Sequence, residues 1–276
     1  MTSLSSFTAS HLGAARGLSQ NEGWPHRPED WRQMFELGDG LVAMDGDTLV
    51  GTIMWWTHPN HATLGMVIVE KDHRSEGLGG RLVSEALARI GNRTVALCAT
   101  DMAHRGYARL GFKAVCAIHQ LQADVPQVLP ESDLPVRILD PSEIGEAAQL
   151  DQSATGLPRE HFLREISSGQ VILGAFEGEV LSAYALLRRA GRGHVIGPIV
   201  APDLRSAKAL VLCAIKQLKG GFVRVDTNPR LGLSAWLQEL GLKRAGGGTA
   251  MVKGTLPLVS EQATAKLFGL ASQAYG

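Results

Sequence analysis

Three glycines open a helical pattern within the stretch Val67 to Leu87, where the sequence best supports phosphate chemistry. An apolar run leads into a charged turn, and Gly77, Gly79 and Gly80 then begin an amphipathic pattern. The first turn of a helix has unpaired backbone N–H groups and carries the positive end of the helix dipole. Glycine lets a ligand approach those groups without meeting a Cβ atom. The stretch therefore predicts a phosphate-binding loop. Arg74 should add positive charge to this loop and help to orient it.

Two other phosphate-binding motifs do not fit this loop. The dinucleotide pattern GxGxxG is absent, and so is the GxxxxGK[ST] pattern of nucleotide triphosphatases. The loop thus lacks the lysine and hydroxyl that would handle a γ-phosphate and magnesium. The loop is expected to take a diphosphate without a metal ion.

The elements that must hold this loop follow from residue periodicity. Helix-like spacing recurs at Leu78, Leu82, Val83, Ala86, Leu87 and Ile90, which predicts one apolar helix face. Other helical segments are expected at Ser10 to Asn21, Pro28 to Leu37 and His104 to Leu110, the last ended by Gly111. Strands are expected at Leu41 to Met44, Thr48 to Thr57, Ala62 to Val69, Thr94 to Ala99 and Phe112 to Leu121. This order predicts an α/β protein with a mixed sheet covered on both faces.

The chain repeats itself once. Two apolar runs flank an acidic-glycine turn at Gly46 and again at Gly178, the signature of a β-hairpin. VEKDHR at Val69 resembles VAPDLR at Val200, and YARLGFKA at Tyr107 resembles LQELGLKR at Leu237. Because the landmarks keep their order and nearly their spacing, we expect an internal duplication, that is, two tandem domains, each a mixed β-sheet flanked by helices.

The boundary between the copies is expected in the proline-containing, aperiodic stretch Leu121 to Pro135. The predicted division is a first domain at 1–122, a linker at 123–134, a second domain at 135–254 and a tail at 255–276. A strand at Val136 to Leu139 should open the second domain. Helical spacing within Ser260 to Tyr275 predicts a C-terminal helix outside both copies.

The pattern V-x4-R-x2-G-x-G-G, from Val69 through Arg74 to Gly80, resembles the acyl-CoA loop of GNAT-type N-acetyltransferases. A second element agrees with this likeness, because Thr100 precedes Tyr107 by seven residues and Tyr107 precedes Gly111-Phe112 by four. The segment Glu22 to Trp24 also resembles a subset of tandem GNAT proteins with a diverged C-terminal half. The resemblance covers nearly the whole chain and is strongest over about Leu41 to Ile118.

The resemblance implies a cosubstrate and a mechanism. Acetyl-CoA would lie between the fourth and fifth strands, with its pantetheine paired to backbone groups of Val67, Ile68 and Val69. Its pyrophosphate would sit on the amides of Ser75, Glu76, Gly77, Leu78, Gly79 and Gly80, and Thr100 would lie near the cofactor. Tyr107 would act as general acid for the leaving thiolate, because a phenol is protonated at neutral pH. The alternative for Tyr107 is packing between helix and sheet.

The general base is left open by the sequence. Family members often carry a glutamate on the fourth strand where this chain has Gly65, so this chain departs from the family pattern at that position. Candidates are Glu22, His26, His58 and His61, or a chain of waters, although each residue also suits a surface or loop role. The HxxH spacing of His58 and His61 lies in a Pro-Asn turn without a nearby carboxylate, and metal binding is not expected there.

Aromatic and acidic residues supply further candidates for the acceptor side. Trp55 and Trp56 are adjacent on a strand and must face opposite sides, so Trp56, like Trp24, could line the acceptor site or fill the core. Asp226 and Asn228 follow a predicted strand and could bind substrate, although Asp-x-Asn-Pro is also favourable turn chemistry.

The second copy lacks the features that the chemistry needs. It has SAKALVL after Arg205 where the first copy has its glycines, and Leu237 in place of Tyr107. We expect it to be structural or to help form the acceptor pocket.

Composition narrows the functional class. Lys plus Arg and Asp plus Glu number 27 each among 276 residues, which gives no electrostatic reason to expect a nucleic-acid or membrane partner. Cys98, Cys116 and Cys213 form no CxxC pair and are expected to be reduced. The sequence has no apparent signal peptide and no long apolar run, so a cytoplasmic protein is expected. We expect it to be a monomer or a homodimer.

The leading functional hypothesis is N-acetylation of a small-molecule amine such as an amino acid, amino sugar, polyamine or amine antibiotic. The alternatives are a protein acetyltransferase acting on lysines or an N-terminus, a non-catalytic acyl-CoA-binding regulator, and a pure interaction protein.

Overall fold

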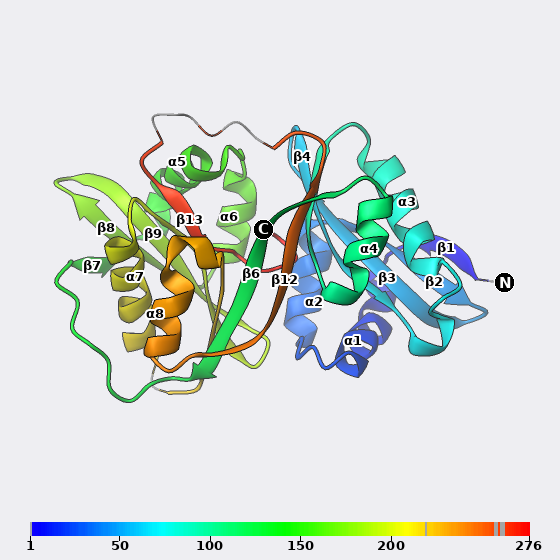
Figure 1. Cartoon of the computed structure of the whole chain (residues 1–276), viewed down its shortest axis with the longest axis horizontal. Coiled ribbons are helices and arrows are strands. Elements are labelled where there is room, and N and C mark those ends of the chain that lie inside the picture. The colour runs from blue at the N-terminus through cyan, green and yellow to red at the C-terminus, as the bar shows by residue number, and fades with distance from the viewer. Residues whose placement is uncertain (1, 219, 257–258, 260–262) are drawn as a thin grey trace.

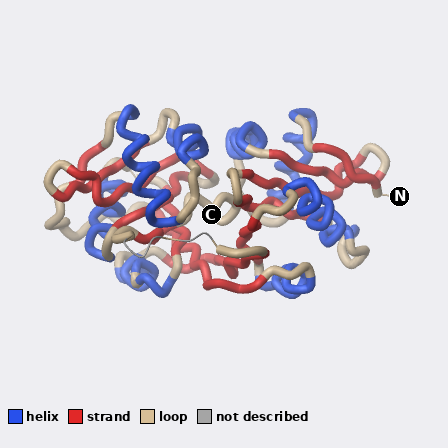
Figure 2. Tube along the Cα trace, turned by 90° about the horizontal axis from the view of Figure 1, so that it is seen from above, coloured by secondary structure: helices blue, strands red, loops and turns tan. Residues whose placement is uncertain are grey.

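The chain folds into two halves that meet at the centre of the molecule, where its C-terminal residues also lie (Figures 1 and 2). This computed structural model describes residues 2–218, 220–256, 259 and 263–276. In that part of the chain, no helix combines the length and apolar character needed to cross a membrane.

The first half has the order that periodicity predicted. Its elements are β1 (Ser3–Ser6), α1 (Leu12–Asn21), α2 (Pro28–Leu37), β2 (Asp39–Asp45), β3 (Thr48–Thr57), β4 (His61–Val69), α3 (Leu78–Ile90), β5 (Thr94–Ala99), α4 (Asp101–Arg109) and β6 (Lys113–Asp124). Helix α2 begins at its proline, with Glu29 and Asp30 in the first turn, as the helix dipole favours. Helix α3 buries the apolar face expected from its spacing.

The second half repeats this order. It comprises β7 (Val136–Ile138), α5 (Ile144–Thr155), α6 (Glu160–Ser167), β8 (Val171–Glu177), β9 (Val180–Ala190), β10 (Gly193–Ala201), α7 (Leu204–Lys216), β11 (Phe222–Thr227), α8 (Leu233–Glu239), β12 (Lys243–Lys253) and β13 (Lys266–Gly269). Both predicted hairpins form, and their turn glycines, Gly46 and Gly178, have φ angles of 57° and 62°. The run from β8 to β12 thus matches the run from β2 to β6.

The two halves exchange their last strands. The thirteen strands of the described residues form one sheet, in the order β1-β2-β3-β4-β5-β12-β6-β11-β13-β10-β9-β8-β7. Strand β12 pairs with β5 of the first half, and β6 pairs with β11 of the second half (Figure 1). The sequence predicted one sheet for each copy. Exchange joins the two sheets because β6 and β12 also pair with each other.

Three clusters of buried side chains follow from this arrangement. One lies under α3 and α4 and includes Met251 of β12, while a second lies under α7 and α8 and includes Leu121 of β6. Each half therefore completes its core with a side chain from the exchanged strand. The third cluster joins the halves, with Trp56 and Ile68 on one side and Tyr184 and Tyr275 on the other.

The prediction of a helix over Ser260 to Tyr275 was wrong where the structure describes that stretch. Residues 260–262 lie outside the described residues, and Lys266–Gly269 form strand β13. This strand lies between β10 and β11 and pairs with both. Backbone pairing with two strands outweighs the apolar spacing of a short segment, which cannot distinguish helix from strand by itself.

Candidate active site

Strands β4 and β5 separate part-way along their length. Their parallel pairing joins His61, Ala62 and Thr63 to Thr94, Val95 and Ala96 and then ends. Further along β4, the register with β3 shifts and Met66 adopts a left-handed conformation, with φ at 53°. This is a β-bulge, which bends and twists a strand locally. The end of β4 is thereby left without a ladder partner on the β5 side.

The glycine loop lies directly after this opening. Ser75 and Gly77 both have positive φ angles, 74° and 76°, and Gly77 caps α3 without a side-chain bond. The backbone N–H groups of residues 75–80 have no hydrogen-bond acceptor among the described residues, and the first bond into the helix is Arg81 N–H to Gly77 O at 3.0 Å. A Cβ atom at Gly77 or Gly80 would meet nothing within 4 Å. The amides are therefore free to bind an anion.

Arg74 ties this loop to the segment between α1 and α2. Its Nε donates to the carbonyl oxygen of Val69 at 2.9 Å, and its Nη2 donates to the carboxylate of Glu22. Glu22, a candidate for the acceptor side, is therefore paired with the loop arginine. The pair fixes the loop at the end of β4.

Tyr107 lies on α4 and is buried against Phe112, with the ring centroids 5.7 Å apart. Burial and the nearby Cys98 raise the pKa of the phenol, so it stays protonated at neutral pH. Cys98 lies on β5 two residues beyond Ala96, the last residue paired with β4. The phenol therefore lies beside the part of β5 that β4 has left. Its hydroxyl has no hydrogen-bond partner in the described part of the chain.

The other candidates for the cofactor side surround the same opening. Ile68 and Leu78 are buried, while Val67, Val69 and Gly79 are half-buried, and Glu76 and Gly80 are exposed. Thr100 is exposed and caps the start of α4.

The candidate histidine bases are uncharged at neutral pH. Burial lowers the pKa of His26, His58 and His61 to about 4 each. The Nδ1 atoms of His26 and His61 are buried without a partner among the described side chains. His61 precedes Met66 by five residues, so the rise of an extended strand separates them by roughly 16 Å. His61 is thus too far from the bulge to take a proton directly from an amine bound there.

The C-terminal residues cover the face of β4 opposite α3. A Cβ atom at Gly65 would lie 3.0 Å from the Cβ of Ala274. Trp56, buried and hydrogen-bonded through Nε1 to Met34 O at 3.1 Å, packs edge-on against Tyr275 at 4.7 Å. Trp55 faces the other core, as adjacent strand residues must. A side chain at Gly65 would therefore be crowded by Ala274, and the chain has no carboxylate at this position.

Asp226 is fully buried on β11 within a polar group that the sequence did not predict. It accepts hydrogen bonds from Arg224 Nε at 2.9 Å and from Gln273 Nε2 at 2.8 Å. Gln273 also donates to Gln120 Oε1 at 3.2 Å and accepts from Cys98 Sγ at 3.6 Å. These contacts join strands far apart in the sequence, so no local pattern could reveal Gln273. Trp24 is half-buried and packs edge-on against His26 at 6.0 Å.

In the second half, the N-terminus of the matching helix α7 is capped by a side chain of the chain itself. Asp203 caps α7 and accepts the N–H of Ser206 at 2.8 Å, and Leu237 is fully buried at the position of Tyr107. The second half therefore lacks the phenol, and Asp203 occupies one of the first-turn amides of α7, whereas no described side chain binds the amides of residues 75–80. Among the described side chains, no group of three or more His, Cys, Asp or Glu is placed to hold a metal ion.

Two family models match this chain, and both describe a GNAT acetyltransferase domain. One covers residues 36–114 and the other residues 147–269, so the matches together span most of the sequence. The fold, with its opened β4 and free helix start, is that of an acetyltransferase. The chain belongs to the GNAT family of acetyltransferases and carries two GNAT domains in tandem.

Relatives and solved structures agree with this assignment. The chain is 23% identical to the uncharacterized N-acetyltransferase YitH of Bacillus subtilis over 78% of each chain. It is 25% identical to holothin acyltransferase of a Pseudoalteromonas species over 71% of this chain and 68% of that protein.

The fold itself is shared with solved structures. A protein of Pyrococcus horikoshii, provisionally described as an acetyltransferase, superposes with a TM-score of 0.82 at 19% identity, covering 100% of this chain and 96% of that one. A tandem GNAT protein from the clavulanic acid biosynthesis pathway superposes with a TM-score of 0.63 at 15% identity, covering 92% and 98%.

Proposed function

We propose that this protein transfers the acetyl group of acetyl-CoA to a primary amine of a small molecule. The observation that carries the proposal is the set of unpartnered amides at residues 75–80, which lies directly after the opening between β4 and β5. A diphosphate suits those amides because they combine free N–H donors with the positive end of α3. The second half, capped by Asp203, is assigned no cofactor.

The cosubstrate follows the free edge of β4 in this proposal. The pantetheine pairs with backbone groups of Val67 to Val69 as an added strand would. A backbone N–H at the bulge then donates to the thioester carbonyl oxygen and stabilises the negative charge that develops there. Arg74 acts by holding the loop, because its guanidinium is bound to Val69 and Glu22.

The reaction is a direct transfer. The lone pair of the neutral amine attacks the thioester carbonyl carbon, so a C–N bond forms and the C–S bond breaks. Tyr107 donates its phenolic proton to the leaving thiolate, the proton lost by the amine passes to water, and the phenolate then takes a proton back from water. An amine with a pKa near that of lysine must first lose its extra proton, because it is mostly charged at pH 7.

The cover over the far face of β4 favours a small acceptor. Ala274 and Tyr275 pack against Gly65 and Trp56, and the second half closes around them. A protein side chain on a folded surface would have to pass this cover. Enclosure therefore favours a small-molecule amine over a protein acceptor.

The cofactor site is tested by adding a charge at the start of α3. Gly80→Asp should fold normally, since its side chain enters open space and an acidic residue stabilises a first helical turn. Its carboxylate would repel the diphosphate, so acetyl-CoA affinity measured by calorimetry should fall at least about tenfold, or about 1.4 kcal/mol.

The matched control is Gly13→Asp in the first turn of α1, another open glycine far from the loop in sequence. It should bind acetyl-CoA like the wild type. Equal affinity in Gly80→Asp and Gly13→Asp would show that the loop does not bind the cofactor. Thiol release from acetyl-CoA with a panel of small amines then tests catalysis.

A further inference from the structure

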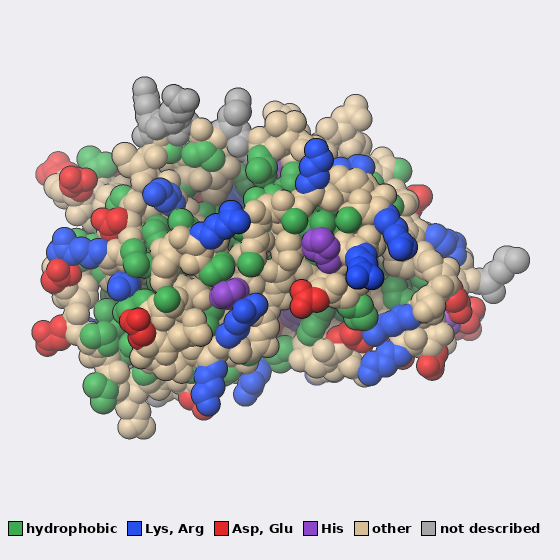
Figure 3. Space-filling model, viewed as in Figure 1, with side chains coloured by type: hydrophobic (Ala, Val, Ile, Leu, Met, Phe, Trp, Pro, Cys, Tyr) green, Lys and Arg blue, Asp and Glu red, His purple; other side chains and the backbone are tan. Residues whose placement is uncertain are grey.

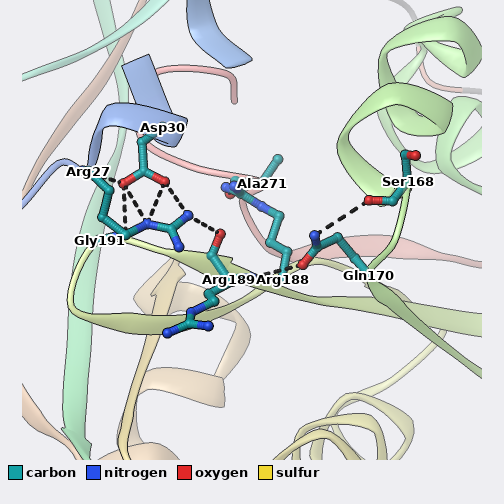
Figure 4. Close-up of polar contacts among 8 residues, drawn as sticks. All are labelled: Arg27, Asp30, Ser168, Gln170, Arg188, Arg189, Gly191 and Ala271. Atoms are coloured by element: carbon teal, nitrogen blue, oxygen red, sulfur yellow. Dashed lines mark hydrogen bonds and ion pairs between the residues drawn. The ribbon is translucent and has the colours of Figure 1, made fainter. Parts of the chain in front are cut away.

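Arg188 is a buried cation at the junction of the two halves (Figure 4). It lies on β9 and is 5% exposed, on the strand face opposite Leu187. Its Nη2 donates to the carbonyl oxygen of Ala271, and its guanidinium carbon lies 5.9 Å from the centre of the Tyr275 ring. Arginine stays protonated in proteins, so a full positive charge lies here.

The charge of Arg188 has no paired carboxylate within the described structure. Its Nε is buried without an acceptor, and Nη2 has only the Ala271 carbonyl. Asp30 is bound instead to Arg27, with Nη2 to Oδ1 at 2.7 Å, and to Gly191 N–H. Asp226 is bound to Arg224 and Gln273. Both nearby carboxylates therefore serve other donors.

An unpaired buried charge is costly, and proteins that keep one usually supply a counter-ion. Arg27 and Arg224 are already neutralised by their own partners, so Arg188 leaves one net positive charge among these groups. A planar guanidinium with a free Nε is suited to a carboxylate, which can accept two parallel hydrogen bonds.

Arg188 is linked to the acceptor face of β4 through a single segment. Ala271 and Tyr275 contact Arg188, while Ala274 contacts Gly65 and Tyr275 contacts Trp56. Residues 271–275 therefore contact both the Arg188 side chain and the Gly65 face of β4.

We propose that Arg188 binds a carboxylate of the acceptor, so that the protein acetylates amines that also carry a carboxylate. The acceptor oxygens would take the Nε hydrogen and the Nη2 hydrogen that Ala271 leaves free. This assignment rests on the proposed function and names its acceptor class. It makes Arg188 a specificity-determining residue, with no part in the bond-forming step.

The test compares carboxylates with their neutral isosteres. The common L-amino acids and their carboxamides are titrated by calorimetry into the protein saturated with CoA, with wild type, Arg188→Gln and Arg188→Lys. At least one acid should bind the wild type about 10- to 100-fold more tightly than its amide. This is the factor expected from the strength of hydrogen bonds to charged groups. Arg188→Gln should remove that preference and leave amide binding within twofold, while Arg188→Lys should keep part of it.

Arg189→Gln is the matched control, because the neighbouring side chain is exposed and no contact of its guanidinium is recorded among the described residues. It should keep the wild-type preference. The proposal is overturned if the wild type does not distinguish any acid from its amide, or if folded Arg188→Gln still does. The wild-type comparison decides the matter even if Arg188→Gln fails to fold.

Failure of the carboxylate proposal can be told from failure of the proposed function. Acetyl-CoA binding and its loss in Gly80→Asp do not involve Arg188. Intact cofactor binding together with equal affinity for acids and amides removes only the carboxylate proposal. Absence of acetyl-CoA binding removes the transferase proposal, whatever the amino acids do.

Discussion

At the scale of single residues, the proposed reaction depends on groups that lack hydrogen-bond partners. Tyr107 has a protonated phenol without a hydrogen-bond partner among the described residues, and its raised pKa follows from burial and from Cys98. Of the other two tyrosines, Tyr184 donates its hydroxyl to Asp151 at 2.6 Å, while Tyr275 packs on Trp56. A free hydroxyl near an opened strand pair is what a proton donor to a bound thiolate needs.

We expect Tyr107→Phe to lower kcat by about 10²-fold or more, as loss of a general acid does. The change removes one oxygen from a buried ring, so acetyl-CoA affinity and thermal stability should stay near those of the wild type. Steady-state thiol release and calorimetry measure the two quantities. Tyr184→Phe is the control, since it also removes a buried hydroxyl but lies on β9. Full kcat in Tyr107→Phe would leave this tyrosine with a packing role.

At the scale of elements, a buried ion pair joins two helices of the second half. Asp151 of α5 accepts from Arg159 Nε at 2.7 Å and Nη2 at 3.0 Å, and also from the hydroxyl of Tyr184 on β9. Arg159 immediately precedes α6 and also donates to Gly276 O at 3.3 Å. This network fixes α5, α6, β9 and the C-terminal segment relative to one another.

Asp151→Asn should therefore destabilise the protein by about 3–5 kcal/mol, because it leaves the buried guanidinium of Arg159 without a counter-charge. Urea unfolding measures the loss. Glu160→Gln is the matched control, since it breaks an ion pair with Arg164 in which both side chains are about half exposed, and it should cost about 0–1 kcal/mol. Equal effects of the two substitutions would contradict the structural role given to Asp151.

At the scale of the whole molecule, strand exchange makes the halves depend on each other. Met251 fills the core of the first half and Leu121 that of the second, so neither core is complete without the other's last strand. Basic and acidic side chains are both spread over the face in Figure 3, as the equal counts in the sequence suggest. Three histidines with lowered pKa values, His26, His58 and His61, line the junction region.

Stability should therefore fall as pH decreases from about 6.5 towards 4. The folded pKa of each of these histidines is about 4, below the ordinary value of 6.5, so the unfolded chain binds more protons in this window. Their contribution is complete above pH 6.5 and is lost as pH falls, at up to about 1.4 kcal/mol per pH unit for each group.

Melting temperatures measured at pH 7, 6 and 5 check this expectation. The double variant His58→Gln with His61→Gln should show a shallower dependence on pH than the wild type. A melting temperature that stays constant down to pH 5 would mean that these histidines are already accessible to protons in the folded state.

Much of the first half could be predicted because its signals are local. The bounds of α2, α3, β3 and β5 match the periodicity, and the free amides at residues 75–80 lie where the glycines and the helix start placed them. The second half lacks these glycines, and Asp203 caps the matching helix α7 with its own side chain. By contrast, the C-terminal segment was expected to be helical, because a few apolar residues fit either period until a neighbouring strand decides between them.

The sequence by itself determined the element order, the duplication and the loop, because these depend on residues within a few turns of one another. Only the tertiary structure decided that β6 and β12 exchange, that residues 271–275 cover β4, and that Arg188 lies unpaired beneath them. Each of these depends on contacts between segments some 80 to 210 residues apart, by sequence number. No local spacing records such contacts, since they are set by which surfaces remain to be buried once the elements have formed.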